Sequence, residues 1–155
     1  MSLTKFQKSI LNWYHKNGRK NLPWQQNISA YSVWISEIML QQTQVVTVIP
    51  YYERFMSSFP TVRDLAEAAQ DVLMEHWAGL GYYSRARNLH QTAKMIISEF
   101  QGIFPNEIDD LVKLPGIGRT TAGAIKSLAF NQRGPILDGN VKRVLSRYHL
   151  SLIHI

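Results

Sequence analysis

One glutamate in this sequence stands where its chemistry would differ from that of a surface acid. Glu37 lies inside the apolar run YSVWISEIML, and at helical spacing Val33 and Leu40 fall on its own face. Burial disfavours the charged form of a carboxylate, so such a glutamate either finds a partner or keeps its proton near neutral pH. A protonated carboxylic acid is what a general acid needs. The structural alternative is a glutamate that bonds a nearby backbone group or reaches solvent.

A second carboxylate, Asp138, follows the apolar residues Ile136 and Leu137 and precedes helical sequence. Helix capping is a sufficient structural reason for an aspartate there. If Asp138 also faces a cleft, its fixed negative charge can stabilise positive charge that develops on a sugar ring. One protonated and one ionised carboxylate are the minimum that hydrolysis of a glycosidic bond requires.

The stretch LPGIGRTTAGAI, residues 114–125, places two glycines directly before good helix-forming sequence. We expect Gly116 and Gly118 to form a tight turn with positive φ angles. The turn leads to a helix N-terminus, where free N–H groups and the helix dipole bind anions such as DNA phosphates. A short helix, this turn and a second helix are typical of a helix-hairpin-helix phosphate clamp. An ordinary loop that needs glycine is the alternative.

Several other residues have types that suit contact with DNA, although each also has an ordinary structural explanation. Gln41, Gln42 and Gln44 follow Glu37 and can reach base edges or simply be exposed. Tyr82 and Tyr83 can stack on bases or fill the core. The basic residues that can contact a phosphate backbone, or be solvated surface charges, are Arg85, Arg87, Arg119, Lys142 and Arg143.

Apolar residues recur at helical spacing almost throughout, so the elements that position these side chains are predicted to be helices. We expect a first helix whose apolar stripe contains Phe6, Ile10 and Trp13, and which ends at Gly18. Further helices are expected over residues 31–40, over 43–59 with a kink at Pro50, twice within 59–81, over 82–100, over 106–111 with Asn106 as its cap, from the hairpin to about residue 130, and after Asp138. No alternating strand pattern competes with these, and the predicted fold class is all-α.

Composition excludes several kinds of site. The sequence contains no cysteine, which excludes disulfides, thiolate metal sites and cysteine catalysis. No two of its five histidines are spaced three or four residues apart, so no local metal-binding pair is visible. A net charge of +6 is compatible with a polyanionic partner without requiring one. Neither a signal peptide nor an apolar run that could span a bilayer is visible, which predicts a cytoplasmic protein with access to DNA.

Five motifs together resemble those of the adenine DNA glycosylases of the MutY type, which belong to the helix-hairpin-helix glycosylase superfamily. They are LPW at residues 22–24, SEIMLQQTQV at 36–45, GLGYYSRARNLH at 79–90, LPGIGRTTAGAI at 114–125 and ILDGNVKRV at 136–144. The resemblance covers the chain to about Tyr148. It implies base-excision DNA repair, in which adenine mispaired with 8-oxoguanine or guanine is flipped out of the duplex and hydrolysed from its sugar.

The resemblance also implies roles for individual residues. Glu37 is expected to protonate the departing adenine. Asp138 is expected to stabilise the oxocarbenium-like sugar and the following attack by water, with Asn140 assisting in the same pocket. The positions expected near the flipped base are Arg19, Leu22 and Trp24. Gln42 and Tyr82 are expected to wedge the duplex and support the orphaned base, and residues 116–118 to form the phosphate clamp. The residues expected to contact DNA are Gln41, Gln42, Tyr82, Leu114, Gly116, Ile117, Gly118, Arg119, Thr120 and Lys142.

Thr120 bears on the type of reaction. Bifunctional relatives such as endonuclease III carry at this position a lysine, whose amine attacks the sugar and forms a Schiff base that leads to strand cleavage. A threonine hydroxyl with no neighbouring base is a poor substitute, so the sequence favours a monofunctional hydrolase. The open alternatives are a bifunctional glycosylase/lyase of the endonuclease III type and a non-catalytic helix-hairpin-helix DNA-binding module.

Full-length members of the resembled family continue into a four-cysteine loop that binds a [4Fe–4S] cluster and then into a C-terminal domain. Because this sequence has neither, we expect a truncated N-terminal part that binds no cluster, contains no metal site and leaves Phe6, Ile10 and Trp13 partly uncovered. The expected divisions are 1–28 and 136–149 as parts of an incomplete iron–sulfur-side domain, 29–135 as a six-helix barrel with the hairpin, and 150–155, LSLIHI, as a foreign tail. We expect a monomer that binds double-stranded DNA with an adenine mispair and does not bind a membrane. Its expected location is the bacterial cytoplasm, in association with the nucleoid.

Overall fold

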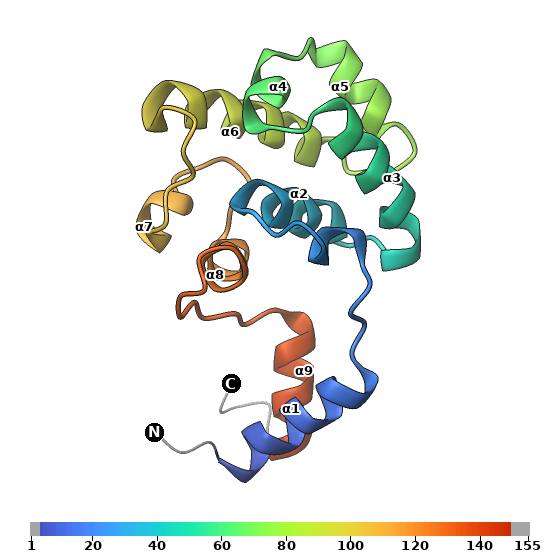
Figure 1. Ribbon diagram of the computed structural model, residues 1–155, viewed down its shortest axis with the longest axis vertical. Helices are drawn as coiled ribbons and strands as arrows, with labels where there is room; N and C mark the ends of the chain where they lie inside the picture. Colours follow the sequence, from blue (N-terminus) through green and yellow to red (C-terminus); the bar gives the residue numbers. More distant parts are fainter. Residues whose placement is uncertain (1–3, 150–155) are drawn as a thin grey trace.

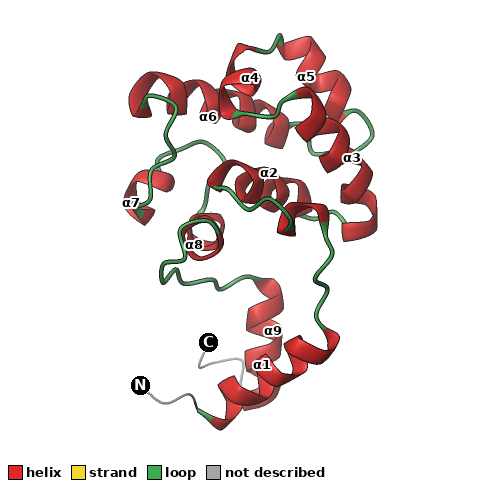
Figure 2. Ribbon diagram, viewed as in Figure 1, coloured by secondary structure: helices red, strands yellow, loops and turns green. Residues whose placement is uncertain are grey.

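The computed structural model describes residues 4–149, and every regular element in that part of the chain is helical (Figure 2). In chain order the elements are α1 (Lys5–Asn17), the short 3₁₀ helix η1 (Pro23–Gln25), α2 (Ala30–Leu40), α3 (Val45–Ser58), α4 (Val62–Glu67), α5 (Gln70–Trp77), α6 (Ser84–Phe100), α7 (Ile108–Leu111), α8 (Arg119–Leu128) and α9 (Gly139–His149). The predicted all-α class is confirmed. No helix within residues 4–149 is long and apolar enough to cross a membrane. The tail expected at 150–155 lies outside the described residues.

The helix α2 lies at the centre of the assembly formed by α2–α8, in contact with α3, α6 and α8 (Figure 1). Eight of its 11 residues are buried, and they face in every direction around the helix. A helix that is apolar all round is stable only where other elements surround it. The central position of α2 therefore explains why the sequence around Glu37 contains so few polar residues.

Large side chains from the surrounding helices complete the core. The ring of Phe55 on α3 lies edge-on to Phe59 at 5.0 Å and to Trp77 of α5 at 6.2 Å between centroids. Full burial of one such side chain contributes roughly 1.5–3 kcal/mol of transfer free energy. The largest fully buried side chains are Trp34, Trp77, Phe55, Ile35, Met39, Leu65, Leu73, Leu89, Ile96, Leu111, Leu114 and Ile125. The core thus extends from α2 to the hairpin before α8.

Polar side chains fix the starts of several helices. The hydroxyl of Ser29 accepts a hydrogen bond from the Ser32 N–H at 3.0 Å, and the Ser29 N–H donates to the Ser32 hydroxyl at 2.8 Å. This reciprocal pair begins α2. Thr4 and Gln7 form the same arrangement at the start of α1, which ends at Gly18 as the sequence predicts.

Two local predictions concern the cap of α7 and a kink at Pro50. The predicted cap of α7 is wrong by one residue, because the helix begins at Ile108 with Glu107, not Asn106, as its N-cap. The Glu107 carbonyl accepts the N–H of the buried Leu111 at 3.0 Å, and burial of Leu111 fixes the register of this single turn. Pro50 lies inside α3, which continues on both sides of it, and the predicted kink stays a prediction.

The first and last helices, α1 and α9, lie against each other at one end of the molecule, away from the α2–α8 core (Figure 1). The rings of Phe6 and Tyr148 have centroids 4.1 Å apart. Ile10 is 43% and Trp13 63% exposed, and Phe6 is half-buried. The expected partial exposure of these three residues is confirmed, whereas the domain boundaries at residues 29 and 136 stay a prediction.

A close backbone contact at Gly123 of α8 guides the chain towards Asp138. A Cβ atom at Gly123 would overlap the carbonyl oxygen of Pro135, and a Cβ atom at Gly134 would overlap the backbone of Gly123. The segment between α8 and α9 therefore runs directly along α8, and only glycine permits this approach.

We expect Gly123→Ala to lower the free energy of unfolding by roughly 1–3 kcal/mol, because the added methyl group pushes the Pro135 segment away from α8. Urea unfolding followed by circular dichroism measures the change. Gly139→Ala is the matched control, since a Cβ atom at Gly139 meets no atom within 4 Å. Equal unfolding midpoints for Gly123→Ala and the unchanged chain would contradict the close contact.

Candidate functional site

One cleft collects residues from three separate parts of the chain, 37–45, 120–121 and 138–140. Its volume is about 600 Å³, and the end of α2, the turn between α2 and α3, the start of α8 and the start of α9 contribute to its walls. The lining residues are Glu37, Leu40, Gln41, Gln42, Thr43, Gln44, Val45, Thr120, Thr121, Asp138 and Asn140. Glu37 and Asp138, which are far apart in the sequence, therefore lie on the same cleft.

The carboxyl group of Glu37 is half-buried near the C-terminal end of α2, beside the buried side chains of Trp34 and Ile38. Burial raises the pKa of Glu37 above its ordinary value, and the negative charge of Asp138 raises this pKa further. The ion pairs found within residues 4–149 do not include Glu37, so no cation there opposes the two effects. Glu37 consequently holds its proton more tightly than an ordinary glutamate.

Asp138 occupies a different environment although it lines the same cleft. Its Oδ1 atom accepts a hydrogen bond from the Val141 N–H at 2.8 Å, which makes it the cap of α9. The positive end of the α9 dipole stabilises a negative charge at this position. Asn140 also lines the cleft, and its Oδ1 atom accepts a hydrogen bond from Arg143 at 3.2 Å. The cleft thus combines an acid whose pKa is raised with a carboxyl group that caps a helix.

The hairpin joins α7 to α8 through a turn that contains both predicted glycines. Gly116 has a φ angle of +78°, as expected, and a Cβ atom there would press on the side chain of Asn88. The expected positive φ at Gly118 is wrong, because this residue is the N-cap of α8 and has a φ angle of −84°, in extended backbone. A single left-handed residue is enough to reverse the chain before a helix starts from an extended cap.

The remaining hairpin residues divide into buried anchors and residues that face outwards. Leu114 and Ile117 are buried, so their side chains hold the turn to the core, and their N–H groups donate to the carbonyls of Leu111 and Leu114 within the hairpin. Arg119 is exposed at the first position of α8. Thr120 is half-buried and lines the cleft that contains Glu37.

Two exposed turns beside the cleft carry strained backbone. Gln42 has a φ angle of +57° and Tyr82 one of +49°, values that side chains other than glycine rarely adopt. Both residues line a second cleft of about 430 Å³, and Gln41 lines both this cleft and the first. Tyr82 is 60% exposed and is not a core aromatic. Backbone strain of this kind gathers at functional sites, which supports a functional interpretation of both turns.

The residues expected near a flipped base do not line the cleft of Glu37. Trp24 lies in η1, which packs on α2 and α3, and its ring is edge-on to Tyr52 with centroids 5.4 Å apart. Leu22 is half-buried next to η1. Arg19 is exposed, and its carbonyl accepts a hydrogen bond from Gln25 at 3.1 Å. Their proposed contact with the base stays a prediction.

Three further placements differ from the sequence analysis. Arg85, expected among the residues that can contact phosphates, is buried and bonds to backbone carbonyls, because its guanidinium completes the end of α2. Thr43 and Thr121 line the Glu37 cleft and were not singled out. Gln42 and Thr120, which are their neighbours in the sequence, are among the predicted DNA contacts. Adjacency to these two residues was therefore the signal that could have identified Thr43 and Thr121. Lys142 is exposed on the first turn of α9.

The family resemblance implies an iron–sulfur cluster with cysteine ligands, and the residues present do not fit one. The chain has no cysteine. In the part of the chain from 4 to 149, no group of three or more histidine and acidic side chains is arranged to hold a metal ion. This chain therefore offers no ligand set for such a cluster.

The raised pKa of Glu37 links stability to pH. Because the pKa is higher in the folded than in the unfolded state, the folded state binds more protons once the pH exceeds the ordinary value of 4.5. The free energy of unfolding then falls as the pH rises through the raised pKa. We expect Glu37→Gln to remove this loss, so that the variant gains stability relative to the unchanged chain between pH 4.5 and neutral pH.

Thermal unfolding of both chains across this pH range measures the difference. Glu53→Gln, the same change at an exposed position of α3, corrects for the removal of one surface charge. A stability difference for Glu37→Gln that stays constant over the range would contradict the raised pKa.

Comparison with known proteins gives a consistent set of relatives. An adenine DNA glycosylase of Buchnera aphidicola subsp. Baizongia pistaciae (strain Bp) is 56% identical over 149 residues, which cover 96% of this chain and 42% of the relative. An adenine DNA glycosylase of Homo sapiens is 47% identical over 154 residues, which cover 94% of this chain and 28% of the relative. The chain thus spans less than half the length of these curated relatives.

Solved structures give the same picture. The structure of a thermostable thymine-DNA glycosylase matches with a TM-score of 0.85 and 26% identity, over 91% of this chain and 65% of that one. A non-covalent endonuclease III–DNA complex matches with a TM-score of 0.80 and 25% identity, over 97% of this chain and 71% of that one. A family model described as HhH-GPD superfamily base excision DNA repair protein matches residues 35–152. Because that match covers well over half of this chain, the chain belongs to the HhH-GPD superfamily of base excision DNA repair proteins.

Proposed function

We propose that this chain supplies the active-site half of a monofunctional adenine DNA glycosylase. The reaction is hydrolysis of the N-glycosidic bond of adenine mispaired with 8-oxoguanine or guanine. The observation that carries the proposal is the shared cleft, in which Glu37 has a raised pKa and Asp138 caps a helix. The relatives in Buchnera aphidicola and Homo sapiens are named adenine DNA glycosylases, which supports the choice of base.

The two carboxyl groups divide the chemistry between them. Glu37 donates its proton to a ring nitrogen of the adenine, and the electron pair of the glycosidic bond leaves with the base. The sugar then carries oxocarbenium-like positive charge, which the Asp138 carboxylate stabilises. Water adds to the anomeric carbon and gives up a proton, for which the Glu37 carboxylate is the acceptor. The cleft has room for an extruded purine, since its volume is about 600 Å³.

Double-stranded DNA is the proposed partner, bound by the monomer without a membrane. Residues 1–28 contain five of the 17 basic residues and no acidic residue, whereas acidic residues outnumber basic ones over residues 29–132. The positive charge is thus concentrated in the segments that form α1 and α9, and α9 begins at the cleft. The exposed start of α8 adds free N–H groups and the positive end of a dipole. These features favour a path of the duplex backbone past the mouth of the cleft. The proposed location is the cytoplasm, in association with the nucleoid.

A hydrolase without lyase activity is the proposed class. Thr120 lines the Glu37 cleft at the position where the resemblance implies a lysine in bifunctional relatives. Threonine carries a hydroxyl group and no amine, so it cannot form a Schiff base with the sugar. A non-catalytic DNA-binding module has no use for the contrast between Glu37 and Asp138, so that alternative is not favoured.

Removal of either carboxyl group tests the proposed reaction. We expect Glu37→Gln to slow single-turnover release of adenine from an 8-oxoguanine:adenine duplex by about 100-fold or more, because the amide has no acidic proton. Asp138→Asn is expected to cost about 100-fold or more, because the sugar cation loses its counter-charge. The complete gene product and the 155-residue chain are assayed side by side.

Glu53→Gln, exposed on α3, is the matched control and should leave the rate unchanged. Rates for Glu37→Gln and Asp138→Asn equal to that of the unchanged protein would refute the mechanism. Release of damaged pyrimidines in place of adenine would refute the choice of base.

Thr120→Lys tests the absence of lyase chemistry. An amine at this position lies on the cleft and can attack the opened sugar, so we expect borohydride to trap a covalent protein–DNA adduct with the variant. Thr47→Lys, the same change at an exposed site of α3, is the control and should give no such gain. Efficient trapping of the unchanged protein would show that a different residue serves as nucleophile.

A further inference from the structure

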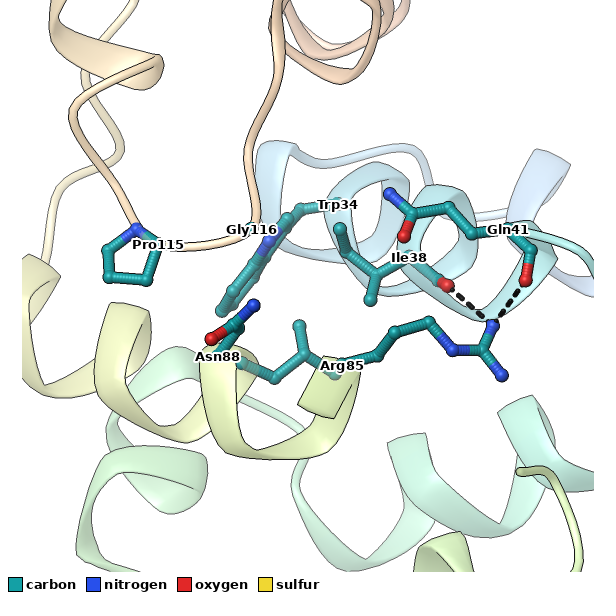
Figure 3. A pocket seen from close by; sticks show the side chains of 8 residues that line it. Trp34, Ile38, Gln41, Arg85, Asn88, Pro115 and Gly116 are labelled. Atoms are coloured by element: carbon teal, nitrogen blue, oxygen red, sulfur yellow. Dashed lines mark hydrogen bonds between the residues drawn. The ribbon is translucent and has the colours of Figure 1, made fainter. Parts of the chain in front are cut away.

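Arg85, at the start of α6, is buried with only 7% of its surface exposed and has no carboxylate partner among the ion pairs of residues 4–149. Its guanidinium makes six hydrogen bonds, five of them to backbone carbonyls. Nη1 donates to the carbonyls of Ile38 (3.0 Å), Met39 (2.8 Å) and Gln41 (2.7 Å), and Nη2 donates to the Thr43 hydroxyl (3.2 Å) and to the carbonyls of Leu80 (3.3 Å) and Gly81 (3.1 Å). Figure 3 shows the guanidinium reaching the end of α2 from α6.

These acceptors explain how a buried cation is tolerated. Three of them, the carbonyls of Ile38, Met39 and Gln41, lie at the C-terminal end of α2, which is the negative end of the helix dipole. The guanidinium also lies over the rings of Trp77 and Tyr82, at 5.3 and 5.4 Å from their centroids. The four N–H groups of Nη1 and Nη2 share these six acceptors, which a lysine ammonium with three donors cannot all reach.

The acceptors belong to two turns that carry the strained residues. One turn, residues 41–43, contains Gln42, and the other, residues 80–82, contains Tyr82. Arg85 therefore ties together the two segments that face each other across the 430 Å³ cleft. Glu37 lies one helical turn before Gln41, so the same contacts fix the end of α2 that carries the proposed acid.

A small cavity extends this arrangement towards the hairpin. Its volume is about 20 Å³, close to that of one water molecule, and its walls include Trp34, Arg85, Asn88 and Gly116 (Figure 3). Arg85 Nε and Trp34 Nε1 are buried here without a hydrogen-bond partner in the described part of the chain. Arg85 thus stands where the two turns, α2 and the Gly116 turn meet.

We propose that Arg85 is a positioning residue that holds the Gln42 and Tyr82 turns as one rigid unit for contact with the duplex. It acts through these two side chains and touches neither substrate nor reacting atoms. Their contact with DNA rests on the proposed function, whereas the rigidity of the two turns does not. The test therefore has one part without DNA and one part with it.

The first part measures backbone hydrogen exchange in Arg85→Lys, which keeps the positive charge but cannot reach all six acceptors. We expect exchange over residues 41–43 and 80–82 to accelerate by at least about tenfold, while exchange in α4 and α8 stays unchanged. Arg63→Lys on α4, whose side chain is 61% exposed, is the matched control and should change neither turn. Unchanged exchange at both turns in Arg85→Lys would overturn the proposal, whether or not the protein is a glycosylase.

The second part is a double-variant cycle with Tyr82→Ala. The readout is the fluorescence of 2-aminopurine placed beside the mispair, at saturating protein, which reports unstacking of the duplex. We expect Arg85→Lys to reduce the signal strongly when Tyr82 is present and to reduce it by a clearly smaller proportion when Tyr82 is already alanine, because only the Gln42 turn then depends on Arg85. Equal proportional losses in both backgrounds would mean a general structural role and would overturn the proposal. Exchange and cycle results as expected, with no adenine release by the unchanged protein, would support Arg85 and refute the proposed glycosylase alone.

Discussion

Burial of α2 by the helices around it controls the charge of Glu37, and the proposed chemistry depends on that charge. The helix is apolar on every side, so α3, α6 and α8 must enclose it. Glu37 lies near its end, far enough along to meet the cleft and still desolvated enough to have a raised pKa. Any change that admitted water along α2 would lower the pKa of this acid, even without touching the carboxyl group.

The second requirement is that Asp138 reaches the same cleft from a distant part of the chain. The contact between Gly123 and the Pro135 segment directs the chain along α8, and the cap of α9 then fixes Asp138. Its proximity has a second effect, since its negative charge further raises the pKa of Glu37. Burial is the larger cause of the raised pKa of Glu37, and the charge of Asp138 is the smaller one.

Much of this could be predicted from the sequence because the signals are local. The apolar run around Glu37, the aspartate before a helix and the glycine turn each follow from neighbouring residues. The role of Arg85 could not be predicted, because its partners are carbonyl groups that every residue carries. The extended φ of Gly118 follows from its place as the N-cap of α8, and the N-cap of α7 lies one residue later than predicted. The errors therefore concern single residues at helix starts and the burial of Arg85, whereas the helices themselves were found.

The protonation state of Glu37 can be measured directly through the chemical shift of its side-chain carboxyl carbon. The signal is assigned by its absence in Glu37→Gln and followed across a pH titration of the isotope-labelled chain. We predict a titration midpoint above the ordinary value of 4.5, and a smaller rise when Asp138→Asn removes the neighbouring charge. A midpoint at or below 4.5 that Asp138→Asn leaves unchanged would contradict the central claim.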